Sequence, residues 1–183
     1  MGYLFSNVTL AVISAVYNYA EISIRRADLG ETSIVRSIVQ EAYGGVKKQL
    51  GGDPAVLQEG LDKISRYIQM GNVYVALIGD AIVGTMRVQL QGQVGTISRV
   101  AVREKFRNRR IGTFLVEYGE NLLTHMGAKC VQLEVSGTTD TQTKFYEGIG
   151  YKQMKRVRHA GEDIILLQKD LFEVPESEDE EDL

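Results

Sequence analysis

The stretch of the chain whose residue types most suggest chemistry is residues 97–113, where basic side chains lie between a predicted strand and a predicted helix. The apolar run Val100 to Val102 favours the end of a strand. The following residues are rich in cations: Arg103, Lys105, Arg107, Arg109 and Arg110. Ile111 begins an apolar pattern with helical spacing, which Gly127 ends. The predicted buried face of this helix consists of Ile111, Phe114, Leu115, Tyr118, Leu122 and Met126. Basic side chains therefore adjoin the first turn of a helix, where each cation is unfavourable by roughly 0.3–1 kcal/mol.

An anion would offset this cost, because the unpaired N–H groups of a helix N-terminus and nearby guanidinium groups both bind phosphate. The segment is therefore a candidate pyrophosphate site. The alternative is a solvated basic turn, which a run of charges also indicates. The chain contains neither Gly-x-x-x-x-Gly-Lys-Ser/Thr nor Gly-x-Gly-x-x-Gly, so neither a P-loop nor a dinucleotide fingerprint is supported.

The charges of the chain are unevenly distributed. Seven of its 24 acidic residues lie in residues 173–183, which leaves 17 acidic residues against 21 basic ones in the rest. We expect an acidic, disordered tail at 173–183. The mildly basic body suits an anionic ligand but is too weakly charged to indicate a nucleic-acid binder. The length of 183 residues and a hydrophobic content of 44% predict one globular domain.

Residues 1–20 contain no charged side chain. Polar residues interrupt this run and no basic leader precedes it, so neither a signal peptide nor a membrane anchor is favoured. We expect an extra strand or helix that packs on the domain or on a second subunit, so a homodimer is compatible with the sequence. The single cysteine, Cys130, excludes an internal disulfide and is compatible with a reducing, cytoplasmic location. His125 and His159 lack metal-ligand neighbours, so no metal site is predicted.

The hydrophobic pattern predicts an alternation of strands and helices. A strand is expected at Ile22–Arg26, a helix at Ser33–Tyr43, a glycine-rich loop over Tyr43–Asp53 and a second helix from Asp53 to about Ile68. The remaining elements are strands over 73–78, 81–90 and 93–102, a helix over 111–126, a strand over 130–135, a short helix from 139 or 140 to 148, and strands over 151–158 and 163–169 around a turn at Ala160-Gly161. The alternation in the strand over 130–135 places Val131, Leu133 and Val135 on one face. Strands on both sides of single helices predict an α+β fold with at least one parallel strand pair.

This order resembles the GNAT superfamily of acetyl-CoA-dependent N-acetyltransferases over residues 21–172. Arg107-x-x-Arg110-Ile111-Gly112 is similar to the family's Arg/Gln-x-x-Gly-x-Gly/Ala signature, and residues 144–151 are similar to its Tyr-x-x-x-Gly-Phe run. The resemblance implies a mostly antiparallel mixed sheet of about seven strands with a parallel central pair, flanked by about four helices. Arg110 is a departure, because the family usually has the first signature glycine at this position.

The resemblance also implies that acetyl-CoA binds along the end of the strand and the start of the helix. Thr139 belongs to this set, although the family frequently has asparagine there. The implied cofactor-binding residues are Val100, Ala101, Val102, Arg107, Asn108, Arg109, Arg110, Ile111, Gly112, Thr113 and Thr139.

Acetyl transfer to an amine needs a neutral amine and a proton for the departing thiolate. Tyr146 is the candidate general acid, because a tyrosine hydroxyl is still a proton donor at neutral pH; the alternative is a tyrosine packed at a helix end. Glu134 is the candidate base, and its spacing to Tyr146 is similar to that in ribosomal-protein N-terminal acetyltransferases. Partial burial would raise the pKa of Glu134 toward a useful range. The alternative is a solvated strand carboxylate or a salt-bridge partner.

We therefore expect an N-acetyltransferase that transfers acetyl from acetyl-CoA to a primary amine by direct attack in a ternary complex. A peptide or protein α-amine is one acceptor that the resemblance suggests. A small-molecule amine acetyltransferase and a CoA-binding regulatory module without turnover stay open as alternatives. Neither nucleic acid nor a membrane is expected as a partner.

Overall fold

The computed structural model describes residues 22–50, 57–137, 140–159 and 162–171. The expected N-terminal extension at 1–20, the acidic tail at 173–183 and Thr139 lie outside these residues. The described part contains one seven-stranded sheet with the strand order β1-β2-β3-β4-β5-β7-β6. The pair β4–β5 is parallel, and the pairs β1–β2, β2–β3, β5–β7 and β6–β7 are antiparallel. The predicted α+β fold with a parallel central pair is confirmed.

Two compact units divide the described residues. The first contains the residues up to Arg87 together with Arg99–Val116, and the second contains Val88–Ser98 and the residues from Glu117 onward. The strands β3 (Ala81–Gln91) and β4 (Val94–Val102) and the helix α4 (Ile111–His125) each contribute to both units. Within the described helices, none is long and apolar enough to cross a membrane.

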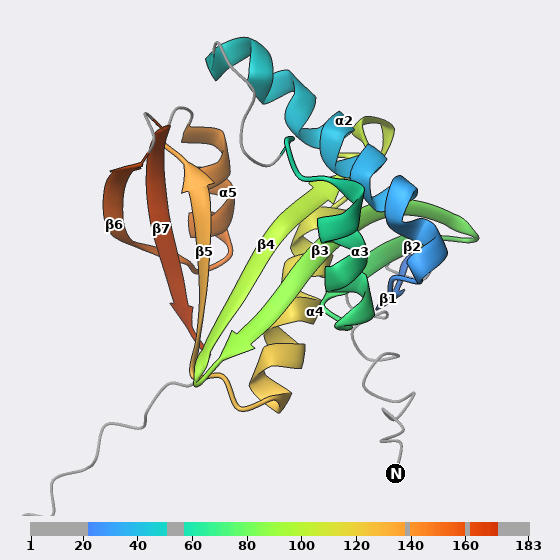
Figure 1. Ribbon diagram of the computed structural model, residues 1–183. Helices are drawn as coiled ribbons and strands as arrows, with labels where there is room; N and C mark the ends of the chain where they lie inside the picture. Colours follow the sequence, from blue (N-terminus) through green and yellow to red (C-terminus); the bar gives the residue numbers. More distant parts are fainter. Residues whose placement is uncertain (1–21, 51–56, 138–139, 160–161, 172–183) are drawn as a thin grey trace, which may run out of the picture. The chain divides into compact units, whose positions relative to one another are not determined.

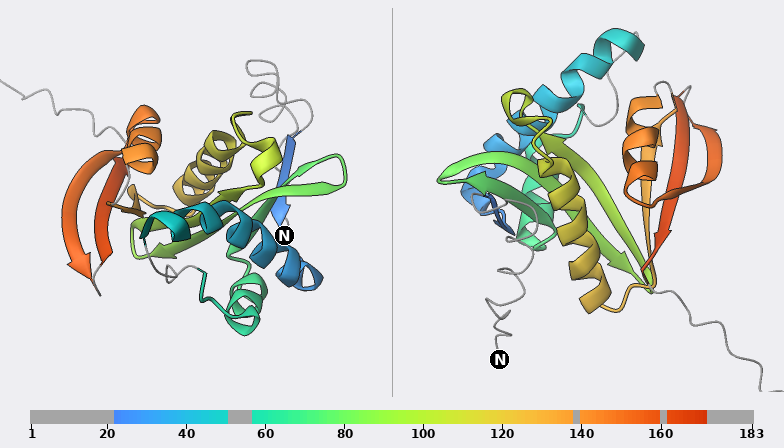
Figure 2. Two further views of the ribbon diagram at one scale, coloured as in Figure 1. Left: turned by 90° about the horizontal axis from the view of Figure 1, so that it is seen from above. Right: turned by 180° about the vertical axis from the view of Figure 1, so that it is seen from behind.

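In the first unit, helices cover both faces of the strands. The helices α2 (Thr32–Leu50) and α3 (Leu61–Gln69) lie on one face of β1 (Ile22–Arg26), β2 (Val73–Ile78) and β3, and the first turns of α4 lie on the other (Figures 1 and 2). Alternate β2 residues Val73 and Val75 pack with Val35 and Ile64, as the period of two in a strand requires. On the α4 face, a Cβ at Gly84 would lie 3.1 Å from Leu115 Cδ1, so glycine lets the helix approach the sheet closely.

Helix α2 extends further than the sequence predicted. The glycine-rich segment 43–50 was expected to be a loop, but it is helical as far as Leu50. Each glycine in a helix costs about 1 kcal/mol relative to alanine, which weakens a helix without forbidding it. The packing of Ala42 and Tyr43 on the cluster of Ile38, Val39 and Ala101 carries the helix up to the glycines, so tertiary burial outweighs their low propensity.

Helix α3 begins later than the sequence predicted. Residues 57–60 are not helical, and Gly60 is the N-cap of α3 with an extended backbone of φ −71° and ψ 159°. Arg87 of β3 instead donates hydrogen bonds of 3.0 and 2.9 Å to the Glu59 carboxylate. The physical reason for the late start is that this tertiary ion pair outweighs the local helical pattern.

In the second unit, β5 (Cys130–Ser136) pairs with β7 (Glu162–Asp170), and β7 pairs with β6 (Lys152–His159). The predicted alternation of β5 is confirmed, because Val131, Leu133 and Val135 are buried. Helix α5 (Asp140–Gly148) follows β5 at the predicted position. The turn expected at Ala160-Gly161 lies outside the described residues.

The buried face of α4 differs from the predicted one near its C-terminus. Leu122 is half-buried and Met126 is 50% exposed, whereas Leu123 is fully buried. Gly95 of β4 explains the difference, because a Cβ there would lie 2.6 Å from Leu123 Cδ1. The space left by this glycine selects Leu123 as the core residue. Gly127 ends the helix with a φ of 90°, as predicted.

Candidate active site

The end of β4 is tied to helix α2 by its backbone and by one small side chain. Ala101 is buried among Ile38 and Val39. The Tyr43 hydroxyl donates a hydrogen bond of 3.3 Å to the Val100 carbonyl oxygen. The side chain of Ala101 thus belongs to the core, and only its backbone could meet a ligand.

Two of the predicted basic residues turn back onto α2. Arg103 donates to a Glu41 carboxylate oxygen at 2.8 Å, and Arg107 donates to the carbonyl oxygens of Val102 and Ala42 at 3.3 and 3.4 Å. The Glu41 carboxylate also accepts the Glu104 N–H at 2.7 Å. This backbone hydrogen bond is the main cause of the lowered pKa of Glu41, and Arg103 and Arg107 add to it against the opposing effect of burial. Arg107 therefore has a role in holding the turn.

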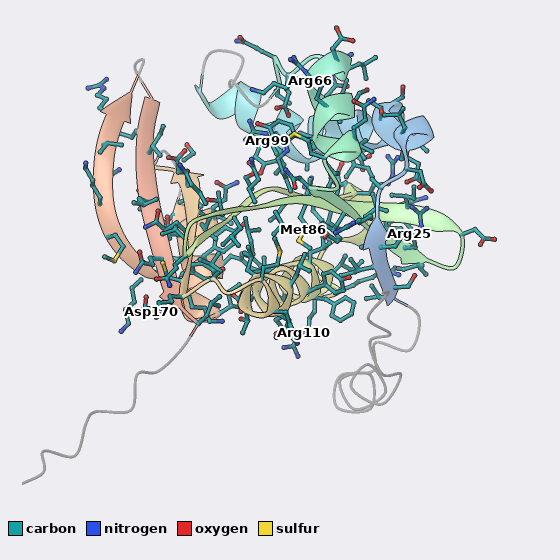
Figure 3. The ribbon with its side chains drawn as sticks, turned by 60° about the horizontal axis from the view of Figure 1, so that its bottom comes forward. Arg25, Arg66, Met86, Arg99, Arg110 and Asp170 are labelled. Carbon is teal, nitrogen blue, oxygen red and sulfur yellow. The ribbon has the colours of Figure 1, made fainter. Side chains whose placement is uncertain are left out.

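The residues just before α4 have an unusual backbone. Asn108 and Arg110 both have a φ of 61°. This value lies in the left-handed region, which residues other than glycine and asparagine rarely adopt. Arg110 occupies the position at which the family signature has a glycine, so the structure keeps at this point a conformation that glycine adopts without strain. Figure 3 shows Arg110 on the side of the sheet that carries α4.

The start of α4 offers a set of hydrogen-bond donors. The Phe114 N–H donates to the Arg110 carbonyl oxygen at 2.9 Å, so by helix geometry the amides of Ile111, Gly112 and Thr113 have no acceptor within the helix. The side chains of Arg109 and Arg110 are exposed beside them. Backbone amides and guanidinium groups together fit the chemistry of a pyrophosphate.

The sequence analysis missed a buried ionic cluster in the first unit. Arg87 donates to both carboxylate oxygens of Glu59 at 3.0 and 2.9 Å, and their side chains are only 7% and 5% exposed. Arg99 Nε and Lys63 Nζ lie 3.5 and 3.6 Å from the same carboxylate. The Arg87 guanidinium also lies 3.7 Å from the centre of the Tyr67 ring. The available signal was Arg87 itself, a charged residue inside an apolar strand.

The charges of this cluster affect the protonation of Glu59. Burial raises the pKa of Glu59, but the hydrogen bonds from Arg87 and the charges of Arg87, Arg99 and Lys63 outweigh it, so the pKa lies below its ordinary value. Glu59 therefore stays ionised at neutral pH. A cavity with room for about one water molecule adjoins the cluster, and Glu59, Arg87 and Arg99 are among its lining residues.

The two predicted catalytic residues lie in the second unit. Tyr146 is half-buried in α5, and its ring lies edge-on to Tyr151, with centroids 5.6 Å apart. Glu134 lies on β5 opposite Leu166 and is exposed. This exposure favours the alternative of a solvated strand carboxylate, because Glu134 lies on the opposite face of β5 from the buried Leu133 and Val135.

The surroundings of Cys130 favour an unreactive thiol. It is half-buried at the start of β5. Burial, with the charge of Asp170 as a second cause, raises the pKa of the Cys130 thiol. The thiolate needed by a nucleophile is thus disfavoured.

Comparisons with known proteins identify related sequences. Residues 69–153 match the family model of the acetyltransferase (GNAT) domain. The PanD regulatory factor of Escherichia coli is 30% identical over 81 residues, which are 43% of this chain and 62% of that protein. The chain thus spans less than two thirds of that relative. An uncharacterized N-acetyltransferase of Chlorobaculum tepidum is 27% identical over 138 residues, which are 75% of this chain and 79% of that protein.

Solved structures share the fold. The PaiA N-acetyltransferase of Thermoplasma acidophilum, in complex with coenzyme A, has a TM-score of 0.71 at 14% identity and covers 81% of this chain and 98% of its own. The ribosomal-protein-S18-alanine N-acetyltransferase of Escherichia coli has a TM-score of 0.70 at 16% identity and covers 85% of this chain and 97% of its own. At these identities the similarity establishes the fold alone.

Proposed function

We propose that this chain, whose residues 69–153 match the model of the acetyltransferase (GNAT) domain, transfers an acetyl group from acetyl-CoA to a primary amine by direct attack in a ternary complex. The observation that carries the proposal is the start of α4, where exposed arginines and amides without helical acceptors adjoin two left-handed residues. The acceptor that we favour is the α-amine of a peptide or protein.

The residues at the start of α4 would hold the cofactor. The amides of Ile111, Gly112 and Thr113 and the side chains of Arg109 and Arg110 would bind the pyrophosphate. The backbone of Val100 to Val102 would align the pantetheine arm. Acetyl-CoA supplies the activated acetyl group as a thioester, and the protein accelerates the reaction mainly by holding both reactants in line.

Two side chains would handle the protons. The Tyr146 hydroxyl donates a proton as the thiol leaves, and the Glu134 carboxylate accepts one from the attacking amine, directly or through water. The exposure of Glu134 gives its carboxylate access to solvent water for this purpose.

The first test is binding of acetyl-CoA, measured as a shift in melting temperature. A ligand at 100 times its Kd stabilises a protein by about 2.7 kcal/mol, and we expect Arg109→Glu to reduce the shift. Arg66→Glu is the matched control, because Arg66 is an exposed arginine on α3. No shift with millimolar acetyl-CoA would contradict the proposal.

The second test separates the enzyme from a regulator. The similarity to a protein named as a regulatory factor favours, as a second candidate, a CoA-binding module without turnover. A thiol-release assay with peptide α-amines and small amines distinguishes the two. Release that depends on the acceptor supports the transferase, and binding without release from any acceptor supports the regulatory module.

A further inference from the structure

The ionic cluster around Glu59 has an excess of positive charge. Arg87, Arg99 and Lys63 approach one carboxylate, so the cluster has a net charge of about +2 by ordinary protonation states. The buried Arg87–Glu59 pair is balanced, so the excess lies on Arg99 and Lys63, whose side chains are 30% and 54% exposed. These partly exposed cations attract an anion from solvent.

The two arginines differ in the donors that remain available. Both terminal nitrogens of Arg87 bond to Glu59, while its buried Nε has no hydrogen-bond partner. Arg99 Nε lies 3.5 Å from a Glu59 carboxylate oxygen and forms no hydrogen bond. Among the described residues, none forms a hydrogen bond with the terminal nitrogens of Arg99, whose side chain is 30% exposed. Arg99 can therefore bind a ligand that enters from solvent.

Arg99 lies next to the strand segment to which we assign the pantetheine arm. It directly precedes Val100, so their Cα atoms are about 3.8 Å apart. Figure 3 shows Arg99 on the side of the sheet that carries α3. The adjoining cavity, lined also by Val35 and Val39 of α2, has room for about one water molecule, which is close to the size of a carboxylate oxygen.

We propose that Arg99, supported by the Arg87–Glu59 pair, binds a carboxylate group of the acceptor amine. A planar guanidinium group matches a carboxylate in a bidentate geometry. The proposal rests on the acetyltransferase function and names the substrate class of the same enzyme. The carboxylate comes either from a free amino acid or from an acidic side chain of a peptide.

The experiment compares matched acceptors in the thiol-release assay. One pair is glycine and glycinamide, and the other is a peptide with glutamate in its second position and the same peptide with glutamine there. We expect kcat/KM to be about ten-fold or more higher for the carboxylate member of one pair. The pair that shows the preference identifies the source of the carboxylate.

Variants of Arg99 test the assignment. Arg99→Gln should abolish the preference, Arg99→Lys should retain part of it, and the exposed control Arg66→Gln should leave it intact. The ratio within a pair does not depend on the fraction of enzyme that is folded, so a purely structural role of Arg99 would leave the ratio unchanged. Equal rates within both pairs, or an unchanged preference in Arg99→Gln, would overturn the carboxylate site and leave the acetyltransferase function standing. No thiol release with any of the four acceptors would overturn both.

Discussion

Replacement of Glu59 by glutamine removes the carboxylate that Arg87, Arg99 and Lys63 share. Glutamine keeps the size of the side chain and one acceptor oxygen, but it leaves the Arg87 guanidinium, 7% exposed, without its counter-charge. Breaking a buried ion pair from one side costs about 3–5 kcal/mol. Arg99 and Lys63 are 30% and 54% exposed, so water screens their part of the loss. We expect a destabilisation of about 3 kcal/mol, at the lower end of this range.

The assay is thermal and urea-induced unfolding followed by circular dichroism. For a domain of this size, 1 kcal/mol corresponds to a change in melting temperature of about 2–4 °C, so Glu59→Gln should lower it by about 6–12 °C. Asp62→Asn is the matched control, because Asp62 is an exposed carboxylate in the first turn of α3. Its loss should cost no more than about 1 kcal/mol. Equal destabilisation by the two substitutions would refute the reasoning.

The effect of Glu59→Gln on the free energy of unfolding should depend on pH. The pKa of Glu59 is lowered in the folded protein from its ordinary value of 4.5, so its charge contributes stability that is present above this value. That contribution is lost as the pH falls through the lower folded pKa. The difference in unfolding free energy between the wild type and Glu59→Gln should therefore be constant near neutral pH and shrink in acid. A difference that grows as the pH falls would contradict the ionised, cation-bound state of Glu59.

Three further predictions concern the core, the start of α4 and the proposed acid. Gly95→Ala should destabilise the protein by about 1–3 kcal/mol, because the new Cβ would clash with the buried Leu123. Gly44→Ala should stabilise it by up to about 1 kcal/mol, because the new Cβ in α2 would meet no other atom. The free energies of unfolding of both variants test this. Arg110→Ala should be about 1 kcal/mol less stable than Arg110→Gly, because both lose the side chain and only glycine tolerates a φ of 61°. Tyr146→Phe should lower kcat by about 10²-fold or more with little change in melting temperature, and unchanged turnover would remove Tyr146 as the acid.

Much of the fold could be predicted because its signals are local. The alternation of Val131, Leu133 and Val135 and the stop at Gly127 depend on residues close together in the chain, and the structure agrees with both. Errors arose where a distant contact decided the outcome. Gly44 did not end α2, because the helix packs on Ala101, which follows 57 positions later.

In the candidate site too, local features could be predicted from the sequence, whereas features that depend on distant contacts could not. The basic segment before α4 was visible in the sequence, but its arginines could not be assigned individually. Only the fold shows that Arg103 and Arg107 bond to α2, while Arg110 adopts a left-handed backbone. Side-chain direction depends on which acceptors the tertiary structure brings within reach, and Glu41 of α2 is the acceptor for Arg103.

The sequence by itself determined the order of strands and helices, the parallel crossover and the basic turn before α4, because periodicity, glycine positions and charge are properties of neighbouring residues. The tertiary structure alone decided that the buried Glu59 and Arg87 and the partly exposed Arg99 form one ionic cluster. These residues come from three separate segments, and none of their local patterns predicts the others. Their mutual attraction exists only after the sheet and the helices have excluded water from around them.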